Sequence, residues 1–286
     1  MMLNKNMKIL VVGLGLMGGS YAKALRRRGY SVSAITKDMS SIEYALEKGI
    51  ISKGTTEIDP QIIGEADLVV FALYPKVFTK WIEENQKFFK SGAVITDVTG
   101  VKGSVVYKVQ DMLRDDVEFI AAHPMAGREV YGVENSDDRI FWGANYIVVP
   151  TEKNTEGATE LCKHLGEVLG FYDISVLSPK EHDEMIAFLS QLTHCIAVSL
   201  MCTNDDPDLV RYTGDSFRDL TRIAKINDEM WSELFLENKN ALLAEMENFR
   251  ATFDKMYKAV RDENRDEMRE MMRLSTSRRS LFDKKH

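Results

Sequence analysis

Short apolar runs and amphipathic stretches alternate through the first 177 residues of the chain. The apolar runs are four or five residues long and rich in Val, Ile and Phe, which is typical of buried strands. These predicted strands cover residues 8–12, 31–35, 68–72, 93–96, 117–121, 145–149 and 172–176. Predicted helices cover residues 40–48, 77–90, 103–113 and 154–169. The alternation predicts an α/β fold with a mostly parallel sheet and helices on both faces.

The pattern changes near Ser178, beyond which the periodicity is helical throughout. An apolar-periodic helix begins at Pro179 and runs to about Cys202. Further helices are predicted over residues 208–224, 227–260 and 262–282. We therefore predict two domains, an α/β domain of residues 1–177 and an all-α domain of residues 178–286.

The longest of these helices carries an apolar stripe. Its members recur at helical spacing: Leu234, Leu242, Met246, Phe249, Phe253, Met256 and Val260. Such a stripe is typical of a core or of an interface. Two long apolar helices on a small domain favour a homodimer interface, and packing within a single helical bundle is the alternative.

Composition narrows the class of protein. The chain has 286 residues, 44% of them hydrophobic and 28% charged, which is typical of a folded globular protein. Its net charge of −7 argues against nucleic-acid binding, so an anionic substrate needs a local basic pocket. The three cysteines are odd in number and show no metal-ligand spacing, which favours reduced thiols, a cytoplasmic location and no metal site. No membrane span or membrane partner is expected.

A glycine-rich turn follows the first predicted strand, in the sequence KILVVGLGLMGGS. Gly13 permits a tight turn, Gly15 lets a pyrophosphate approach the backbone, and Gly18 lets the next helix pack on the strand. The N-terminus of that helix, with Leu16 and Met17, offers unpaired N–H groups to the phosphates. The stretch predicts a dinucleotide site in a Rossmann-type domain, and a glycine turn that binds nothing is the alternative.

The end of the second strand bears on the choice of cofactor. An acidic residue at this position bonds the ribose 2′-hydroxyl of NAD, and here the position falls on Thr36, followed by Lys37. A hydroxyl and a cation suit a 2′-phosphate, so the sequence favours NADP over NAD. The alternative is that Asp38 takes the acidic role. Leu73, Tyr74 and Pro75 after the next strand, and Asp97 further along, are the other expected cofactor contacts.

Three motifs carry candidate chemistry. In AAHPMAGRE, His123 follows a predicted strand, where a neutral imidazole can accept a proton near pH 7. In LSQLTHCIA, Gln191 and His194 lie on one side of a helix. In SFRDLTRIAK, Arg218, Arg222 and Lys225 are spaced to share a helix face, and arginine is suited to binding carboxylates.

These motifs resemble those of the prephenate dehydrogenase (TyrA) family of tyrosine biosynthesis. The resemblance rests on GLGLMGGS, ITDVTGVKG, HPMAG and the TRIA and ENK segments, and it runs from about residue 8 to residue 282. It implies NAD(P)-dependent oxidative decarboxylation of prephenate to 4-hydroxyphenylpyruvate. Arogenate is the substrate of some members.

The resemblance also implies roles for single residues. His123 matches the catalytic histidine, His194 a second active-site histidine, Arg222 the substrate arginine, and Glu129 an acidic residue near the substrate. Arg218 stands at a position where members of the family usually carry another basic residue. Gln191 stands at a position where they often carry a histidine. Members often carry Gly-Ser before Val-Lys, and here the pair is Thr99-Gly100, so Thr99 either supplies the hydroxyl or the contact is missing.

Two other classes of protein share part of this pattern. A β-hydroxyacid dehydrogenase-like reductase has a similar glycine opening and helical second domain, but it uses a helix-borne lysine as acid or base. A non-catalytic nucleotide sensor would need no arginines opposite His123. Turnover of prephenate with either nicotinamide cofactor distinguishes these possibilities.

Overall fold

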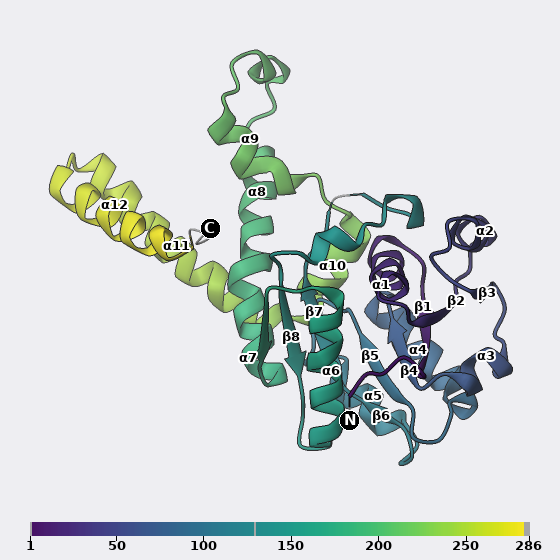
Figure 1. Cartoon of the computed structure of the whole chain (residues 1–286). Coiled ribbons are helices and arrows are strands. Elements are labelled where there is room, and N and C mark those ends of the chain that lie inside the picture. Colours follow the sequence, from purple (N-terminus) through teal and green to yellow (C-terminus); the bar gives the residue numbers. More distant parts are fainter. Residues whose placement is uncertain (1, 129, 283–286) are drawn as a thin grey trace. The chain divides into compact units, whose positions relative to one another are not determined.

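The computed structural model describes residues 2–128 and 130–282, and the chain divides into two compact units, Met1–Asn238 and Lys239–His286 (Figure 1). In the described residues, the first unit contains both sheets and the α-helices α1 to α10. The second unit consists of the last long helices. Glu129, one of the predicted site residues, lies outside the described residues.

A six-stranded parallel sheet forms the centre of the first unit, in the order β3-β2-β1-β4-β5-β6. Its strands are β1 (Lys8–Val12), β2 (Ser31–Ile35), β3 (Lys53–Thr55), β4 (Leu68–Phe71), β5 (Val94–Asp97) and β6 (Glu118–Phe119). The short strand β3 is not among the predicted strands. In β1, Ile9 and Val11 face one hydrophobic core and Leu10 and Val12 face the other. Both faces of the sheet are therefore buried, which explains the continuous apolar runs in the sequence.

Helices cover both faces of this sheet, as the alternating pattern predicts (Figure 1). One core receives side chains from α1 (Leu16–Arg27), α2 (Met39–Glu47) and α6 (Glu156–Leu169). The other receives side chains from α3 (Pro60–Glu65), α4 (Pro75–Asn85) and α5 (Val106–Met112). The order of the strands reverses direction between β1 and β4, and ligands of such sheets bind at the carboxyl ends of the strands there.

A second sheet of three strands adjoins the first. It consists of β7 (Ala121–Met125), β8 (Asn145–Val149) and β9 (Asp173–Val176), with β7 antiparallel to β8 and β8 parallel to β9. The strand predicted for residues 117–121 is thus two strands, because the chain leaves β5 after Ile120 and pairs with β8 instead. The prediction that His123 follows a strand is wrong, since it lies within β7 opposite Ile147.

The apolar helix after residue 178 forms as predicted, with one irregularity. It consists of α7 (Pro179–Ile186), a π-helical segment (Ala187–Leu192) and α8 (Thr193–Cys202). A capping box of Ser178 and Glu181 fixes its start. The whole helix is long and apolar enough to cross a membrane by length and composition, although no such stretch is expected from the sequence. A single helix of this kind is weak evidence for a membrane protein, because core helices meet the same criterion.

The predicted helix over residues 208–224 is broken. A 3₁₀ turn (Pro207–Arg211), α9 (Asp215–Thr221) and a second 3₁₀ turn (Arg222–Ala224) replace it, and α10 (Asp228–Glu237) follows. Lys225 has extended backbone, so the prediction that it shares a helix face with Arg218 and Arg222 is wrong. The helical pattern is interrupted by Thr213-Gly214 before α9 and by Asn227, the N-terminal cap of α10, after the second 3₁₀ turn.

The second unit consists of α11 (Lys239–Arg261) and α12 (Arg265–Arg279), which pack side by side (Figure 1). The helix predicted over residues 227–260 is two helices, α10 and α11, which meet at Asn238. Much of its apolar stripe is exposed in the single chain, including Phe253 at 61% and Val260 at 58%.

Candidate active site

The glycine turn has the local geometry expected from its sequence. Gly13 has a φ of +97°, which side chains rarely tolerate. A Cβ on Gly18 would stand 1.8 Å from the carbonyl oxygen of Gly13, so only glycine lets α1 approach β1 this closely. A Cβ on Gly15 would meet nothing within 4 Å, and Gly15 immediately precedes α1. The space above the N-terminus of α1, beside Leu16 and Met17, fits the approach of a phosphate.

The end of β2 presents three polar residues toward the same edge of the sheet. β2 ends at Ile35, and Thr36 donates its backbone N–H to Thr55 at 3.2 Å. Lys37 is exposed. Asp38 caps α2, and its carboxylate accepts bonds from the backbone N–H and the hydroxyl of both Ser40 and Ser41. Those bonds, with the Ser41 hydroxyl contributing most, lower the pKa of Asp38.

The loop after β4 lies against the glycine turn. Leu73 Cδ2 stands 2.9 Å from where a Cβ on Gly13 would be. Tyr74 precedes α4 and is 44% exposed, and Pro75 occupies the first turn of that helix, where its missing N–H costs nothing. Of these three predicted cofactor contacts, Leu73 lies directly against the turn.

Asp97 and Lys102 form a fully buried ion pair at the end of β5. Lys102 Nζ donates to Asp97 Oδ2 at 2.7 Å, to the Ala122 carbonyl at 2.6 Å and to Thr99 Oγ1 at 3.2 Å. Asp97 also accepts from the Thr99 hydroxyl and from the backbone of Thr99 and Ala122. The structure therefore favours a structural role for Asp97 over the predicted cofactor contact. It equally directs the Thr99 hydroxyl to Asp97 and away from His123.

His123 lies next to this pair and belongs to a chain of hydrogen bonds. Its Nδ1 is 2.9 Å from Nε2 of His182, which is fully buried on α7. Nδ1 of His182 is in turn 2.8 Å from Oδ1 of Asp183. The Asp183 carboxylate also accepts the backbone N–H of Lys102 at 2.8 Å and of Gly103 at 2.7 Å. The loop after β5 thus holds the carboxylate that ends the chain.

Burial controls the protonation of this cluster. Burial lowers the pKa of His123 well below its usual 6.5, and His182 and Lys102 lower it further. Burial also lowers the pKa of His182, against the opposing effect of Asp183. The pKa of Lys102 is lowered by burial, although Asp97 beside it opposes this. His123 is therefore neutral at pH 7 and can accept a proton.

Gly100 and α10 bound the other side of His123. A Cβ on Gly100 would stand 4.0 Å from Nε2 of His123 and 3.6 Å from Leu234 on α10. In the part of the chain that the structure describes, no residue hydrogen bonds to this Nε2. Gly100 thus faces the imidazole and supplies no hydroxyl to it. Glu233 and Glu237, also on α10, accept from the Lys76 backbone and the Ser104 hydroxyl.

Gln191 and His194 both contact α10, on the side that their spacing predicts. His194 stacks on Trp231 with ring centroids 3.7 Å apart, and its Nδ1–H donates to the Ser190 carbonyl. Gln191 is buried, and its amide donates to the Leu234 carbonyl and accepts from Asn238. The structure therefore favours a structural role for Gln191 over the predicted contact with substrate.

The two arginines lie in the segment that packs on α8. Arg218 donates to Asp215 at 2.6 Å and to the Thr213 carbonyl, and it is exposed. Arg222 begins the 3₁₀ turn after α9, and this turn contacts α8. The segment that carries Arg222 thus borders the same helix as His194.

The motifs of the sequence do not reveal His182, Asp183 or Lys102. A signal for the first two exists, because His182 precedes the buried Ile186 by one helical turn and so lies on the buried face of α7. A buried polar residue at such a position needs a partner. For Lys102 the signal is weaker, since lysine is rarely buried.

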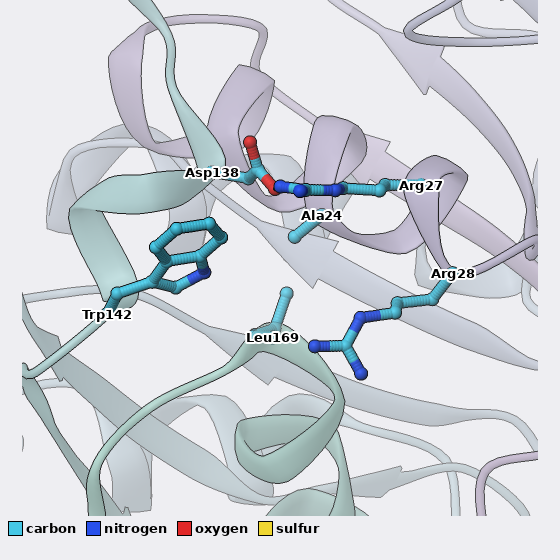
Figure 2. A pocket seen from close by; sticks show the side chains of 6 residues that line it. All are labelled: Ala24, Arg27, Arg28, Asp138, Trp142 and Leu169. Atoms are coloured by element: carbon cyan, nitrogen blue, oxygen red, sulfur yellow. The ribbon is translucent and has the colours of Figure 1, made fainter.

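A small pocket lies apart from all of these residues (Figure 2). It has a volume of about 180 Å³ and is lined by Ala24, Arg27, Arg28, Asp138, Trp142 and Leu169. Arg27 is paired with Asp138 at 2.8 Å and lies over the Trp142 ring. None of the predicted site residues lines this pocket, so it is not the candidate active site.

The parallel sheet carries a glycine turn, and a neutral histidine lies near its carboxyl edge. Together these features define a nucleotide-dependent dehydrogenase of Rossmann type. Residues 21–171 match the family model "Prephenate dehydrogenase, nucleotide-binding domain", and residues 178–274 match "Prephenate dehydrogenase, dimerization domain". The chain belongs to the prephenate dehydrogenase family. The glycine turn itself precedes the first matched residue.

Individual relatives agree with this assignment. A prephenate dehydrogenase of Lactococcus lactis is 31% identical over 87% of this chain and 70% of its own. A crystal structure of the A. aeolicus prephenate dehydrogenase, in complex with hydroxyphenyl propionate and NAD+, is 32% identical over 97% of this chain and 98% of its own, with a TM-score of 0.89. An arogenate dehydrogenase of Synechocystis is 25% identical over 96% of this chain and all of its own, with a TM-score of 0.82.

Proposed function

We propose that the chain catalyses the NAD(P)-dependent oxidative decarboxylation of prephenate to 4-hydroxyphenylpyruvate, with arogenate as the alternative substrate. The observation that carries the proposal is a neutral, half-buried His123 with Nε2 directed to Gly100, in a chain of this family. A nicotinamide cofactor, held by the glycine turn and the loop after β4, would supply the acceptor for the hydride of the ring carbon that bears the hydroxyl. His123 accepts the hydroxyl proton, and loss of CO2 makes the ring aromatic and the reaction effectively irreversible.

Roles for the other residues follow from this proposal. Arg222 binds a substrate carboxylate, because a guanidinium forms charge-assisted bonds with carboxylates. Arg218 adds positive charge nearby, although it is paired with Asp215 in the free chain. His194, stacked on Trp231, lines the substrate side. Gly13, Gly15, Leu16, Met17, Gly18 and the loop Leu73–Pro75 hold the dinucleotide.

We propose NADP as the preferred cofactor. Four hydrogen bonds from Ser40 and Ser41 already occupy the Asp38 carboxylate, which leaves it a poor acceptor for a ribose hydroxyl. Lys37 is exposed at the end of β2 and offers a cation to a 2′-phosphate. Lys37→Ala should lower kcat/KM for NADP about tenfold, the effect of about 1.4 kcal/mol, and leave the value for NAD unchanged. Lys48→Ala at the end of α2 is the control, and a wild-type preference for NAD would contradict the proposal.

Turnover with defined substrates tests the activity. The purified chain is mixed with prephenate or arogenate and with NADP or NAD, and reduced nicotinamide is followed by its absorbance. Turnover of prephenate or arogenate supports the proposal, and their relative kcat/KM shows the preferred substrate. Oxidation of a β-hydroxyacid alone would assign the chain to that class of dehydrogenase. Cofactor binding without turnover of any of them would indicate a sensor.

The helical part of the chain is proposed to bind substrate and to form a homodimer. Ser178 begins it, where the capping box starts α7 and where the dimerization-domain match begins. The exposed apolar residues of α11 support an interface with a second copy. The reduced cysteines of the chain and its proposed biosynthetic activity favour a cytoplasmic location.

A further inference from the structure

His123 is one member of a three-residue chain that ends on a fixed carboxylate. Nδ1 of His123 meets Nε2 of His182 at 2.9 Å, and Nδ1 of His182 meets Oδ1 of Asp183 at 2.8 Å. His182 has no exposed surface and Asp183 is 9% exposed. Such a chain is not needed to hold α7 in place, since the capping box and the Asp183 bonds to the loop after β5 already do so.

The direction of each hydrogen bond follows from the carboxylate. An ionised Asp183 can only accept, so His182 donates from Nδ1. A neutral His182 then has its lone pair on Nε2, and this atom can only accept. His123 must therefore donate from Nδ1. The lone pair of neutral His123 is left on Nε2, the atom that faces Gly100.

We propose that His182, oriented by Asp183, is a positioning residue that keeps the proton of His123 on Nδ1 and so presents Nε2 as the base for the substrate hydroxyl. The inference rests on the proposed function and adds two residues that act through His123. In the reaction the substrate O–H bond breaks and an Nε2–H bond forms, while the electron pair left on oxygen expels the hydride to the nicotinamide. The Nδ1–H of the resulting imidazolium still donates to His182.

Neutral His182 also supplies an acceptor for the imidazolium that His123 becomes, although a charge on His182 would oppose it. An imidazolium in a dry site is costly unless its N–H groups are bonded, and His182 supplies an acceptor for one of them. Lys102 opposes this charge, whereas Asp183 and Asp97 favour the charged form of the neighbouring His182. Without His182 the Nδ1 proton would lack its acceptor. The imidazole would then favour the other tautomer, with its proton on Nε2, which cannot act as a base.

Two substitutions of His182 separate positioning from packing. His182→Phe fills the space without an acceptor, whereas His182→Gln places an amide oxygen where it can accept the Nδ1 proton of His123. We expect His182→Phe to lower kcat at least 100-fold with KM for prephenate unchanged within threefold, and His182→Gln to recover at least tenfold of the loss. His164→Phe on α6, outside the site, is the matched control and should keep the wild-type kcat. A kcat within threefold of wild type in His182→Phe, or equal kcat in the Phe and Gln variants, would overturn the proposal.

Nitrogen NMR of the histidine rings tests the tautomer directly and does not depend on turnover. The chain has only five histidines, so ring-¹⁵N labelling gives few signals, and loss of one set in His123→Asn assigns His123. We expect the His123 ring of the wild type to carry its proton on Nδ1 at pH 8. This measurement does not use His182→Phe, so it can be made even if that variant does not fold. A proton on Nε2 would refute the proposal. Failure of the wild type to turn over prephenate or arogenate would instead refute the proposed function, and the tautomer would still be measured.

Discussion

At the scale of single residues, His123 is the group on which the proposed chemistry depends. Its Nε2 is the base, so His123→Asn should lower kcat by about 10²–10⁴, the usual contribution of a general base. Binding of the cofactor, followed by fluorescence titration, should stay within twofold of wild type. Turnover near the wild-type rate in this variant would remove His123 from the role of base.

The pH dependence of the same residue gives an independent check. Because burial lowers the pKa of His123 well below 6.5, the basic form persists at pH values where an exposed histidine is already protonated. We expect kcat/KM to stay level from pH 8 to below 6.5 and to fall only at more acid pH, where one proton inactivates the free enzyme. A fall centred at or above pH 6.5 would show that the imidazole is not desolvated as the structure indicates.

The sequence predicts these residues unevenly, for a physical reason. Gly13 and Gly18 stand in a turn that restricts the residue type, and His123 stands in the local motif HPMAG. Other residues act through contacts that no motif contains. His182 bonds to His123, 59 positions away, Asp183 to Gly103, 80 positions away, and Lys102 to Asp97, 5 positions away. Burial alone gives these three polar side chains their role. Asp97 and Gln191 are predicted to contact ligands, and in the structure their side chains bond within the protein.

At the scale of elements, the strand–turn–helix unit of β1 and α1 gives two glycines different tasks. Gly18→Ala would place a Cβ 1.8 Å from the Gly13 carbonyl and should destabilise the fold by about 1–3 kcal/mol as α1 moves off β1. Gly15→Ala meets nothing within 4 Å and should leave Tm unchanged while weakening cofactor binding about tenfold. Thermal unfolding and cofactor titration of the two variants measure both effects. Unchanged binding in Gly15→Ala would mean that the phosphates do not approach this backbone.

The elements themselves follow the sequence pattern where local periodicity decides and depart from it where pairing decides. β1, β2 and α6 match their predicted ranges closely, because each buries a regular apolar pattern. Whether residues 121–125 extend the parallel sheet or pair with β8 depends on a partner that lies 20 or more residues away. The break between α10 and α11 is likewise absent from the local pattern, because the apolar stripe continues across it without interruption.

At the scale of the whole molecule, buried neutral histidines make stability depend on pH. In the unfolded chain His123 and His182 titrate near 6.5, whereas burial lowers both pKa values in the folded chain. Below pH 6.5 the unfolded state therefore binds more protons, and the free energy of unfolding falls as the pH is lowered, by up to about 1.4 kcal/mol per pH unit for each histidine.

Urea unfolding between pH 7.5 and 5.5 measures this dependence, in a range where exposed carboxylates hardly titrate. The wild type should lose stability mainly between pH 6.5 and 5.5. His182→Gln should lose less over that interval, and His164→Phe as much as the wild type. A stability curve that is level to pH 5.5 would show that both histidines take up protons in the folded chain as easily as in the unfolded one.

The exposed apolar residues of α11 support the homodimer proposed above. Phe249 and Phe253 on α11 have ring centroids 6.2 Å apart, and both are more than one third exposed. An apolar patch of this kind is rarely left open to water, and the match to a dimerization domain covers α11. We expect the chain to sediment at twice its mass of 32.5 kDa, and Phe253→Glu to sediment as a monomer, because burying the new carboxylate in the interface costs several kcal/mol. Lys255→Glu, which alters charge on another side of α11, should remain a dimer. A wild-type chain that sediments as a monomer at micromolar concentration would assign this stripe to packing within one chain.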